Sequence, residues 1–391
     1  MNKKSISIIG GAGHVGMPLA LKFAEKNYNV ICIDKNEKLN NLLNKGILPY
    51  EEKGAKKLLA KSLKNKKIKF VSNFQEIQNT KYIIITVGTP VDKQKKPNMN
   101  FVFQVIKSMK KYIHSNHSII LRSTLYPGTT DQIIKKLRKE RIKAKVSYCP
   151  ERVAQGISIF EIENLPQIIS SESNDELKKI KILFKKICKH VEILNFIEAE
   201  YSKLFSNAWR YIKFAVSNEF YMLSKIKKFD FDKVYKAMTF NYPRNAGLPK
   251  QGFAAGPCLP KDSIQLYQSC PEYSKLSKNA YAINQSMPKF LIDIVKKTMK
   301  LNNKNVGVLG TTFKSGIDDE RNSLSIDLIK NLKKEKAKVY FYDPYTLSEN
   351  QASLKIIMEK CKVIFIGTPH PEFKKINFKK KIVIDCWNFI N

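Results

Sequence analysis

The sequence predicts an α/β protein in which two doubly wound parallel-sheet domains, both Rossmann-like, are joined by a central helical spine. Short apolar strands alternate with amphipathic helices at both ends of the chain, as in a parallel sheet covered by helices. Residues 196–300 show helical periodicity and no strand pattern. The length of 391 residues suits two or three domains.

The first predicted domain spans residues 1–195 and contains most of the strands. Its expected strands are Ser5–Ile9, Asn29–Ile33, Lys69–Val71, Tyr82–Val87, Ser118–Arg122, Lys145–Tyr148 and Val191–Leu194. Because these strands alternate with helices, we expect one parallel sheet whose carboxyl ends share an edge.

The second predicted domain, residues 196–300, is helical, and the third, residues 301–391, is a smaller α/β unit. The expected helices of the second are Glu198–Ile226, Lys233–Met238, Lys261–Gln268 and Tyr273–Lys300. A helix as long as the first of these often forms a domain spine and a dimer surface. In the third domain we expect strands Val306–Gly310, Lys338–Tyr342, Val363–Gly367 and Lys381–Asp385, with helices Ser325–Lys334 and Ser353–Lys360.

A nucleotide-binding fingerprint follows the first strand. The sequence Gly11-Ala12-Gly13-His14-Val15-Gly16 is G-x-G-x-x-G between a strand and a helix. The glycines permit a tight turn, a close approach to a pyrophosphate and close helix packing. Asp34 closes the next strand, where a carboxylate accepts from a ribose 2′-hydroxyl, so we predict NAD rather than NADP. The alternative is a glycine-rich turn of some other α/β protein.

Small hydroxyl residues follow two further strands. Thr89 lies in Val87-Gly88-Thr89-Pro90, and Ser123 and Thr124 open the segment Ser123–Thr130. Ligands of open α/β sheets bind at the carboxyl ends of strands, so these hydroxyls are candidate contacts for a cofactor or a water. Each segment could equally be a plain turn.

Two sets of polar residues are candidates for chemistry. Glu151, in Cys149-Pro150-Glu151-Arg152, is a candidate general base, or else a capping or ion-paired glutamate. Glu200, Lys203, Asn207 and Arg210 share one face of the expected spine helix. That face either lines a cleft or is solvated.

Cys258 is the candidate nucleophile among seven scattered cysteines, none of which forms a C-x-x-C pair. It follows the small residues of Gly252-Phe253-Ala254-Ala255-Gly256-Pro257 and starts a predicted helix, with Asp262 one turn later. A helix N-terminus and a nearby lysine lower the pKa of a thiol. A structural cysteine in a tight loop is the alternative. We predict no metal site.

The net charge of +36 has two interpretations: a polyanionic partner or compositional drift. Only seven of the 70 basic residues are arginine, whereas proteins that recognise nucleic acid usually rely on arginine. The lysines are spread along the chain, which favours drift. A basic nucleic-acid-binding protein remains the alternative from another functional class. We expect no nucleic-acid partner, no membrane association and a cytoplasmic location.

Together these motifs resemble the nucleotide-sugar 6-dehydrogenases, the UDP-glucose and UDP-N-acetylhexosamine dehydrogenase family. The resemblance extends over nearly the whole chain. The motifs that carry it are GAGHVG, VGTP, STLYPGTT, CPER, E-x-x-K-x-x-x-N followed by SNE, GPCLPKD, NQSMP, Thr312-Phe313-Lys314, Asp318-Asp319-Glu320-Arg321, Asp343-Pro344 and Thr368-Pro369-His370. The segments RSTLYPGTT, CPERVAQG and FAAGPCLPKD are most similar to UDP-N-acetylglucosamine or UDP-N-acetylmannosamine dehydrogenases. This resemblance implies a role in surface polysaccharide synthesis. A UDP-glucose dehydrogenase is the alternative, and a single-step Rossmann dehydrogenase, which needs no cysteine, is the second.

The resemblance implies a four-electron oxidation of a sugar C6 alcohol to the uronic acid with two NAD⁺ in turn. The aldehyde is held on Cys258 as a thiohemiacetal, oxidised to a thioester and released by water. Lys203 and Asn207 would donate to the oxyanion, which is a large electrostatic term in a dry site. Asp262 or Glu151 would accept a proton or orient the water, and Thr124 would hold that water.

The resemblance also implies a UDP-binding role for the third domain and a homodimer. Lys314 and Arg321 match substrate-binding positions, with Arg321 expected to reach the site of the partner subunit. The expected cofactor residues are Gly11, Gly13, His14, Val15, Gly16, Asp34, Thr89, Ser123, Thr124 and Lys314. The expected substrate residues are Glu151, Arg152, Lys203, Asn207, Arg210, Tyr242, Arg244, Gly252, Lys314 and Arg321.

This chain departs from the family pattern at two places. It has Ala254 and Ala255 where many members carry glycine, and Asn-Ser-Leu after Arg321 instead of Glu-Ser-Pro. These departures leave every proposed catalytic side chain in place and bear on substrate choice and loop geometry.

Overall fold

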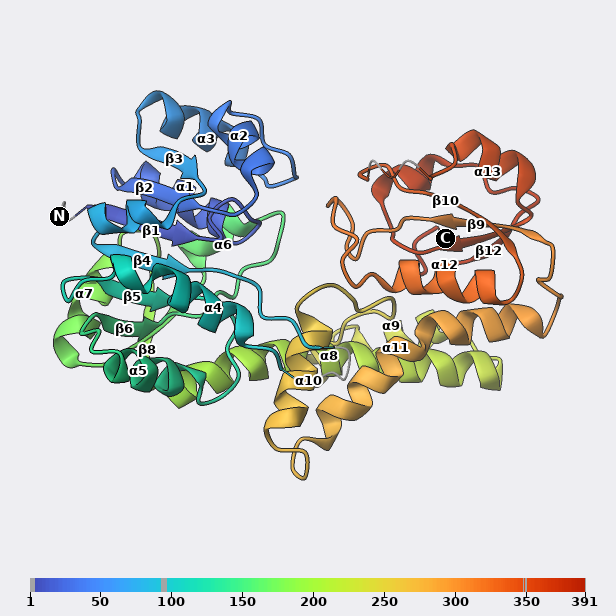
Figure 1. Cartoon of the computed structure of the whole chain (residues 1–391). Helices are drawn as coiled ribbons and strands as arrows, with labels where there is room; N and C mark the ends of the chain where they lie inside the picture. The colour runs from blue at the N-terminus through green and yellow to red at the C-terminus, as the bar shows by residue number, and fades with distance from the viewer. Residues whose placement is uncertain (1–3, 93–96, 347, 349, 391) are drawn as a thin grey trace. The chain divides into compact units, whose positions relative to one another are not determined.

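The computed structural model describes residues 4–92, 97–346, 348 and 350–390. The chain divides into two compact units, Met1–Phe205 and Ser206–Asn391 (Figure 1). The boundary falls inside the long helix α8, Phe196–Lys227, so this helix contributes to both units. The three-domain division stays a prediction.

The first unit contains one eight-stranded sheet of order β3-β2-β1-β4-β5-β6-β7-β8. Its first six strands have the 3-2-1-4-5-6 order of a doubly wound dinucleotide-binding fold. The strands are β1 (Ser5–Ile9), β2 (Asn29–Ile33), β3 (Ile68–Val71), β4 (Tyr82–Ile85), β5 (Ser118–Leu121), β6 (Lys145–Tyr148), β7 (Gln167–Ser171) and β8 (Val191–Ile193). Runs such as Ile83-Ile84-Ile85 are fully buried, as expected for strands covered on both faces.

Helices cover both faces of this sheet. Apolar side chains of α1, α3, α6 and α7 form one core cluster, and those of α4 and α5 form the other. This two-sided cover confirms the doubly wound fold of the first unit. The helices are α1 (Gly16–Glu25), α2 (Glu37–Asn44), α3 (Ala55–Lys64), α4 (Asn100–Met109), α5 (Thr129–Lys139), α6 (Ser158–Asn164) and α7 (Asn174–Phe184), with short 3-10 turns at Phe74–Asn79 and Lys110–Tyr112.

Strand β7 was not predicted, and it makes the first sheet mixed rather than wholly parallel. It pairs antiparallel with β6, with Ser147 opposite Ser171 and Tyr148 opposite Ser170. Its sequence, Gln-Ile-Ile-Ser-Ser, has only two apolar residues, so local strand preference is weak and the buried pairing decides its structure.

The second unit combines helices with a four-stranded parallel sheet. The sheet order is β10-β9-β11-β12, so the chain crosses from one side of β9 to the other. Its strands are β9 (Asn305–Leu309), β10 (Lys338–Tyr342), β11 (Val363–Ile366) and β12 (Ile382–Ile384), and its helices after α8 are α9 (Phe231–Thr239), α10 (Leu259–Ser269), α11 (Lys275–Lys296), α12 (Leu324–Lys334) and α13 (Leu354–Lys360), with 3-10 turns at Pro243–Asn245 and Pro371–Lys375. Helix α11 is shorter than the predicted Tyr273–Lys300, and the other predicted helices agree within a few residues.

Within the described ranges, no helix is both long and apolar enough to cross a membrane.

Candidate functional site

The glycine-rich loop of the first unit has the geometry of a pyrophosphate cradle. A Cβ atom added at Gly11 would lie 2.6 Å from the carbonyl oxygen of Ile8, and one at Gly16 would lie 2.3 Å from that of Gly10. These two glycines are therefore required by packing. At Gly13 an added Cβ would meet only Gly10 oxygen, at 3.5 Å, so the space above Gly13 is open to a ligand. This loop, followed directly by α1, fits the pyrophosphate of NAD.

Tyr50 closes over this loop, and sequence reasoning missed it. Its hydroxyl donates to the carbonyl oxygens of Ala12, at 2.9 Å, and Gly13, at 3.3 Å. Its ring stacks on that of His14, with the centroids 4.3 Å apart. Tyr50 therefore fixes the peptide groups on which the cradle depends.

Asp34 lies directly after β2, at the carboxyl edge of the sheet, and is half-buried. Its carboxylate accepts from the backbone amide of Asn36 at 3.1 Å, and an exposed oxygen can accept more than one hydrogen bond. This is the position from which a carboxylate contacts the ribose of NAD. Val15, another predicted cofactor residue, lies in the glycine-rich loop and is 36% exposed.

The loops after β4 and β5 are tied together at the same edge. Thr89 Oγ1 donates to the carbonyl oxygen of Thr124 at 2.6 Å, and Ser123 Oγ donates to that of Val87 at 2.6 Å. The structure therefore joins the three predicted hydroxyl residues in one cluster. A hydroxyl that donates one hydrogen bond can in principle also accept one from a ligand or a water.

Glu151 is an ion-paired carboxylate, one of the alternatives left open by the sequence. Its Oε2 accepts from Arg122 Nε at 2.8 Å and lies 2.5 Å from Arg122 Nη2. Its Oε1 accepts from the backbone amides of Arg152, at 2.8 Å, and Val153, at 3.1 Å. Both oxygens are engaged, so this geometry supports a positioning role better than that of a free base.

Arg122 was missed as a functional residue, although a charged residue ending an apolar strand is a signal. It is only 2% exposed, and its Nη1 donates to Gln167 Oε1 at 2.8 Å. Arg152, the neighbour of Glu151, donates to the carbonyl oxygen of Pro166, and burial lowers the pKa of its guanidinium. Gln167, the first residue of the unpredicted strand β7, and Pro166, just before it, thus hold the side chains of Arg122 and Arg152.

The polar face of α8 is not a solvated face over most of its length. Glu200 is 1% exposed and accepts from the backbone amides of Gly128, at 2.6 Å, and Thr130, at 2.8 Å, at the start of α5. Burial raises the pKa of its carboxyl. Lys203 and Asn207 are 7% and 5% exposed, whereas Arg210 is exposed. The solvated-face interpretation is therefore wrong for the first three residues.

Cys258 is distinguished from the other cysteines by exposure and by its place on a helix. Five of the seven are buried, and burial raises the pKa of the Cys149 thiol to about 12, which keeps it protonated. Cys258 and Cys270 are exposed, at the N-cap and the C-cap of α10. A helix N-terminus stabilises a thiolate and a C-terminus does not. Cys258 is thus the thiol best placed to act as a nucleophile.

A buried carboxylate lies one turn after this thiol. Asp262 is fully buried; its Oδ2 accepts from Asn207 Nδ2 at 2.5 Å and its Oδ1 lies 2.7 Å from Lys261 Nζ. Its backbone amide donates to the carbonyl oxygen of Cys258 at 2.9 Å. The structure therefore brings together three predicted catalytic residues in the second unit. Lys203, Glu151 and Thr124 belong to the first unit.

The segment before Cys258 is held by residues that were not predicted. Asn218 is fully buried; its Oδ1 accepts from the Gly252 amide at 2.8 Å and its Nδ2 donates to the Gly252 oxygen at 3.0 Å. Gly252 has φ +148°, and a Cβ there would lie 2.2 Å from the Trp387 ring. Ala254 packs in a small core with Tyr211. Gly252 and Ala254 are thus explained by packing, whatever substrate contact they make.

Arg321 is paired with an aspartate of its own loop. Its Nε and Nη2 donate to the Asp319 carboxylate at 2.9 and 2.5 Å. Hydrogen bonding to Asp319 raises the pKa of Arg321. The expected reach of Arg321 into the site of a partner subunit stays a prediction.

Lys314, Tyr242 and Arg244 lie on loops of the second unit. Lys314 is exposed on the loop after β9. The Arg244 guanidinium lies 5.9 Å from the centre of the Tyr242 ring; Arg244 lies within a short 3-10 turn, and Tyr242 precedes it. Their predicted contact with a sugar stays a prediction.

Three family models match nearly the whole chain. They describe the NAD-binding, central and UDP-binding domains of the UDP-glucose/GDP-mannose dehydrogenase family and match residues 4–188, 197–286 and 307–391.

Individual relatives agree with these matches. The chain is 28% identical to a UDP-N-acetyl-D-mannosamine dehydrogenase of Pyrococcus horikoshii, over 97% of this chain and 94% of the relative. It is 27% identical to a UDP-glucose 6-dehydrogenase of Rickettsia bellii, over 97% and 94%. The solved structure of a UDP-D-ManNAc dehydrogenase from Pyrococcus horikoshii superposes with a TM-score of 0.92 at 27% identity, covering 99% of this chain and 96% of the other.

The dinucleotide cradle, the exposed helix-capping cysteine and the ordered matches along the chain lead to one assignment. The chain belongs to the UDP-glucose/GDP-mannose dehydrogenase family and is an NAD-dependent nucleotide-sugar dehydrogenase.

Proposed function

We propose that this enzyme oxidises the C6 alcohol of a UDP-N-acetylhexosamine, UDP-N-acetylmannosamine in the first place, to the uronic acid. The exposed Cys258 at the start of α10, one turn before the buried Asp262, is the observation that carries this proposal. The relatives named as UDP-N-acetyl-D-mannosamine dehydrogenases support the choice of sugar. UDP-glucose is the alternative, because relatives of that name match at nearly the same identity.

In the proposed mechanism Cys258 holds the substrate between two oxidations. NAD⁺, when bound, accepts a hydride in each oxidation. The sulfur adds to the C6 aldehyde, and the resulting thiohemiacetal is oxidised to a thioester. Water then releases the carboxylate and restores the thiol. Per sugar, two NAD⁺ and one water give one carboxylate, two NADH and three protons. Covalent retention prevents loss of the reactive aldehyde.

Asn207 and Lys203 are the proposed donors to the oxyanion on C6. Asn207 uses one hydrogen of Nδ2 for Asp262, and the second hydrogen remains for the substrate oxygen. Lys203 lies one helical turn before Asn207 on α8 and adds a positive charge. In a site closed to water such donors stabilise the transition state strongly.

Asp262 is the proposed group that orients the attacking water. Its carboxylate is fixed by Asn207 and Lys261, so it can hold a water without moving. Glu151 would act mainly by shaping the loop that carries Arg152, because both of its oxygens are already engaged.

We also infer a homodimer formed through α8. This helix exposes a stripe of apolar side chains, with Phe205, Trp209 and Leu223 at 55%, 60% and 50% exposure. Such residues are costly to leave in water and are typical of a subunit interface. We expect a Trp209→Lys variant to shift the molar mass in multi-angle light scattering from dimer to monomer. A wild-type monomer would contradict the inference.

We infer a cytoplasmic location from the unpaired cysteines. All seven are free, which is usual in a reducing compartment.

A substrate panel tests the proposed function. NADH formation is followed with UDP-N-acetylmannosamine, UDP-N-acetylglucosamine, UDP-N-acetylgalactosamine and UDP-glucose, and the uronic acid is quantified. We expect two NADH per sugar, with UDP-N-acetylmannosamine preferred. Turnover of UDP-glucose alone would refute the proposed sugar, and one NADH per sugar would indicate a single-step dehydrogenase.

A Cys258→Ser variant tests the covalent mechanism, with Cys270→Ser as the matched control on the same helix. We expect the first to lose at least about 1,000-fold in steady-state uronic acid formation, since serine is a far weaker nucleophile. The control should keep wild-type turnover. Unchanged turnover by Cys258→Ser would exclude the thioester.

A further inference from the structure

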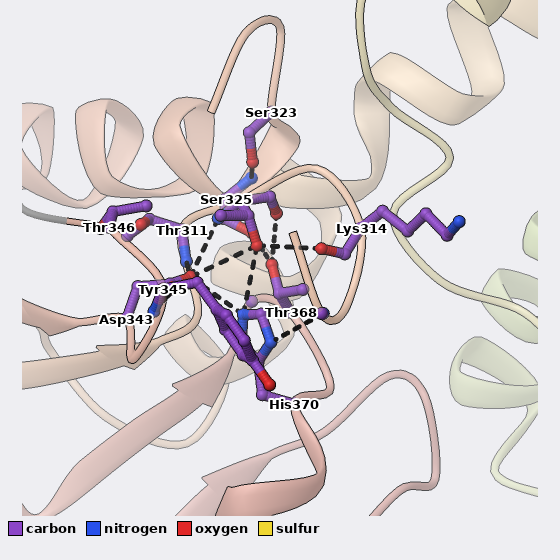
Figure 2. A network of polar contacts seen from close by, with 12 residues as sticks. Thr311, Lys314, Ser323, Ser325, Asp343, Tyr345, Thr346, Thr368 and His370 are labelled. Carbon is purple, nitrogen blue, oxygen red and sulfur yellow. Dashed lines mark hydrogen bonds and ion pairs between the residues drawn. The ribbon is translucent and has the colours of Figure 1, made fainter. Parts of the chain in front are cut away.

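Three loops of the second sheet meet at its carboxyl edge and are joined by a buried polar network (Figure 2). The loops follow β9, β10 and β11. Asp343 comes from the loop after β10, and Thr368 and His370 come from the loop after β11. All three side chains are nearly or completely buried. Ligands of open α/β sheets bind outside this edge, so the network lies under the surface where this fold binds its ligands.

Asp343 is the centre of the network. Its Oδ2 accepts from the backbone amides of Thr311, at 2.7 Å, and Thr312, at 3.1 Å, and lies 3.0 Å from His370 Nε2. Its Oδ1 accepts from the Tyr345 amide at 2.9 Å. Burial opposes the charge, yet the hydrogen bonds from His370 and from the backbone amides prevail and lower the pKa of Asp343 to about 2. A buried charge with this many donors is firmly held.

His370 connects this carboxylate to the far end of the loop after β9. Its Nδ1 accepts from the Gly316 amide at 3.3 Å, so the ring proton lies on Nε2, which faces Asp343. The start of the loop is bound by Asp343 directly. Asp343 and His370 therefore fix the loop at both ends.

The middle of the loop is fixed through threonine hydroxyls. Thr312 Oγ1 donates to the carbonyl oxygen of Lys314 at 3.0 Å, and Thr368 Oγ1 donates to that of Thr312. The Lys314 backbone is thereby held, while its side chain extends away from the network (Figure 2) and is exposed.

We propose that Asp343 and His370 are positioning residues for the nucleotide diphosphate: they fix loop 311–316 so that the Lys314 ammonium is presented to the anionic substrate. This inference rests on the proposed function, in which Lys314 contacts the UDP-sugar. A loop that is ordered before binding loses less conformational entropy when the ligand arrives, so affinity is higher. Neither positioning residue is itself required to touch the substrate.

A double-mutant cycle on the full chain distinguishes positioning from general support of the fold. The variants are Lys314→Ala, His370→Gln and the double variant, and calorimetry gives the Kd of UDP and of NAD⁺ for each. Glutamine keeps a donor near the place of Nε2 and loses the acceptor for Gly316. We expect each single variant to weaken UDP about tenfold and the double variant no more than Lys314→Ala alone. The Kd of NAD⁺ should stay within about twofold of wild type.

Two further variants serve as a rescue and a control for this test. His370→Asn keeps an acceptor near the place of Nδ1, and we expect it to restore UDP binding to within about threefold of wild type. Glu372→Gln is the matched control: Glu372 accepts from the Tyr345 hydroxyl at 2.7 Å but has no part in holding loop 311–316, so its UDP affinity should be unchanged.

The outcomes separate this inference from the proposed function. Additive effects of Lys314→Ala and His370→Gln, or an equal loss of UDP and NAD⁺ binding, would overturn the positioning role while leaving the function intact. If Lys314→Ala alone left UDP binding unchanged, the assignment of Lys314 would fail, and the positioning role with it.

Discussion

The two sheets carry an aspartate at the same place and use it differently. In the first unit β2 ends at Ile33 and is followed by Asp34; in the second β10 ends at Tyr342 and is followed by Asp343. The neighbouring turns also match. The Gly10 amide donates to the Ile33 oxygen at 2.8 Å, and the Gly310 amide donates to the Tyr342 oxygen at 2.8 Å.

The difference lies in what surrounds each carboxylate. Asp34 is half-buried and accepts from the backbone amide of Asn36, which leaves it accessible to a ribose. Asp343 is 1% exposed, and its oxygens meet three backbone amides and His370. One carboxylate is available to bind a nucleotide, and the other is used to build the loop beside it. A topologically equivalent residue thus need not keep its function when a fold recurs.

Loop length explains why the second sheet needs this internal support. In the first unit α1 begins at Gly16, only a few residues after β1, so its N-terminus faces the anion directly. In the second unit α12 begins at Leu324, and the intervening loop starts at Gly310. A loop of this length has many conformations unless something holds it. The Asp343 network limits those conformations and leaves Lys314 to meet the phosphate.

The largest effect should come from breaking the first cradle while sparing the second sheet. A Cβ at Gly16 would lie 2.3 Å from the backbone oxygen of Gly10 and 2.7 Å from the Cα of Gly11, so Gly16→Ala must displace the cradle. We expect NAD⁺ to bind roughly 100-fold more weakly, with UDP affinity unchanged. Isothermal titration with each ligand measures both. Equal loss of both affinities would contradict the assignment of NAD⁺ binding to the first sheet and UDP binding to the second.

The next prediction concerns Asp34, the accessible aspartate. Asp34→Asn removes the charge beside the ribose, and we expect the Kd of NAD⁺ to rise about tenfold, with little change in the melting temperature. The discrimination against NADP⁺ should also decrease, since the repulsion of a 2′-phosphate is lost. Steady-state kinetics with both cofactors measure this. Unchanged preference would mean that another residue selects NAD⁺.

The buried aspartate should respond in the opposite way, through stability rather than cofactor affinity. A folded-state pKa of about 2, below the ordinary 3.8, means that ionised Asp343 stabilises the fold above about pH 4. This contribution, of about 2 kcal/mol, is lost as the pH falls through about 2. Asp343→Asn should therefore lower the free energy of unfolding by at least about this amount at pH 7.

Urea titrations of both proteins at several pH values measure this effect. The difference between wild type and Asp343→Asn should shrink as the pH falls from about 4 toward 2, because protonation removes the same charge in the wild type. A difference that stays constant over this range would contradict a folded-state pKa of about 2 for Asp343.

Sequence reasoning found the residues whose signal is local and missed those whose partners are distant. The G-x-G-x-x-G spacing lies within six residues of one turn, and the strand ends follow from alternation of apolar segments. Tyr50, Arg122 and Asn218 act on residues that lie tens of positions away: Gly13, Gln167 and Gly252. No short-range pattern encodes such a pair. His370 and Asp343 stood out as family motifs, but their joint role needs the three loop ends to be brought together by the sheet.

The smallest effect should come from Tyr50. It holds the glycine-rich loop after β1, as the Asp343 network holds the loop after β9. Tyr50→Phe keeps the ring stacked on His14 and removes the hydrogen bonds to the Ala12 and Gly13 oxygens. One such hydrogen bond contributes about 1 kcal/mol, so the Kd of NAD⁺ should rise about fivefold with UDP binding unchanged. Tyr50→Ala also removes the stacking and should weaken NAD⁺ further. If Tyr50→Phe left NAD⁺ binding at wild-type strength, the glycines alone would determine the conformation of the loop after β1. Support from residues outside the loop would then be needed only for the longer loop after β9.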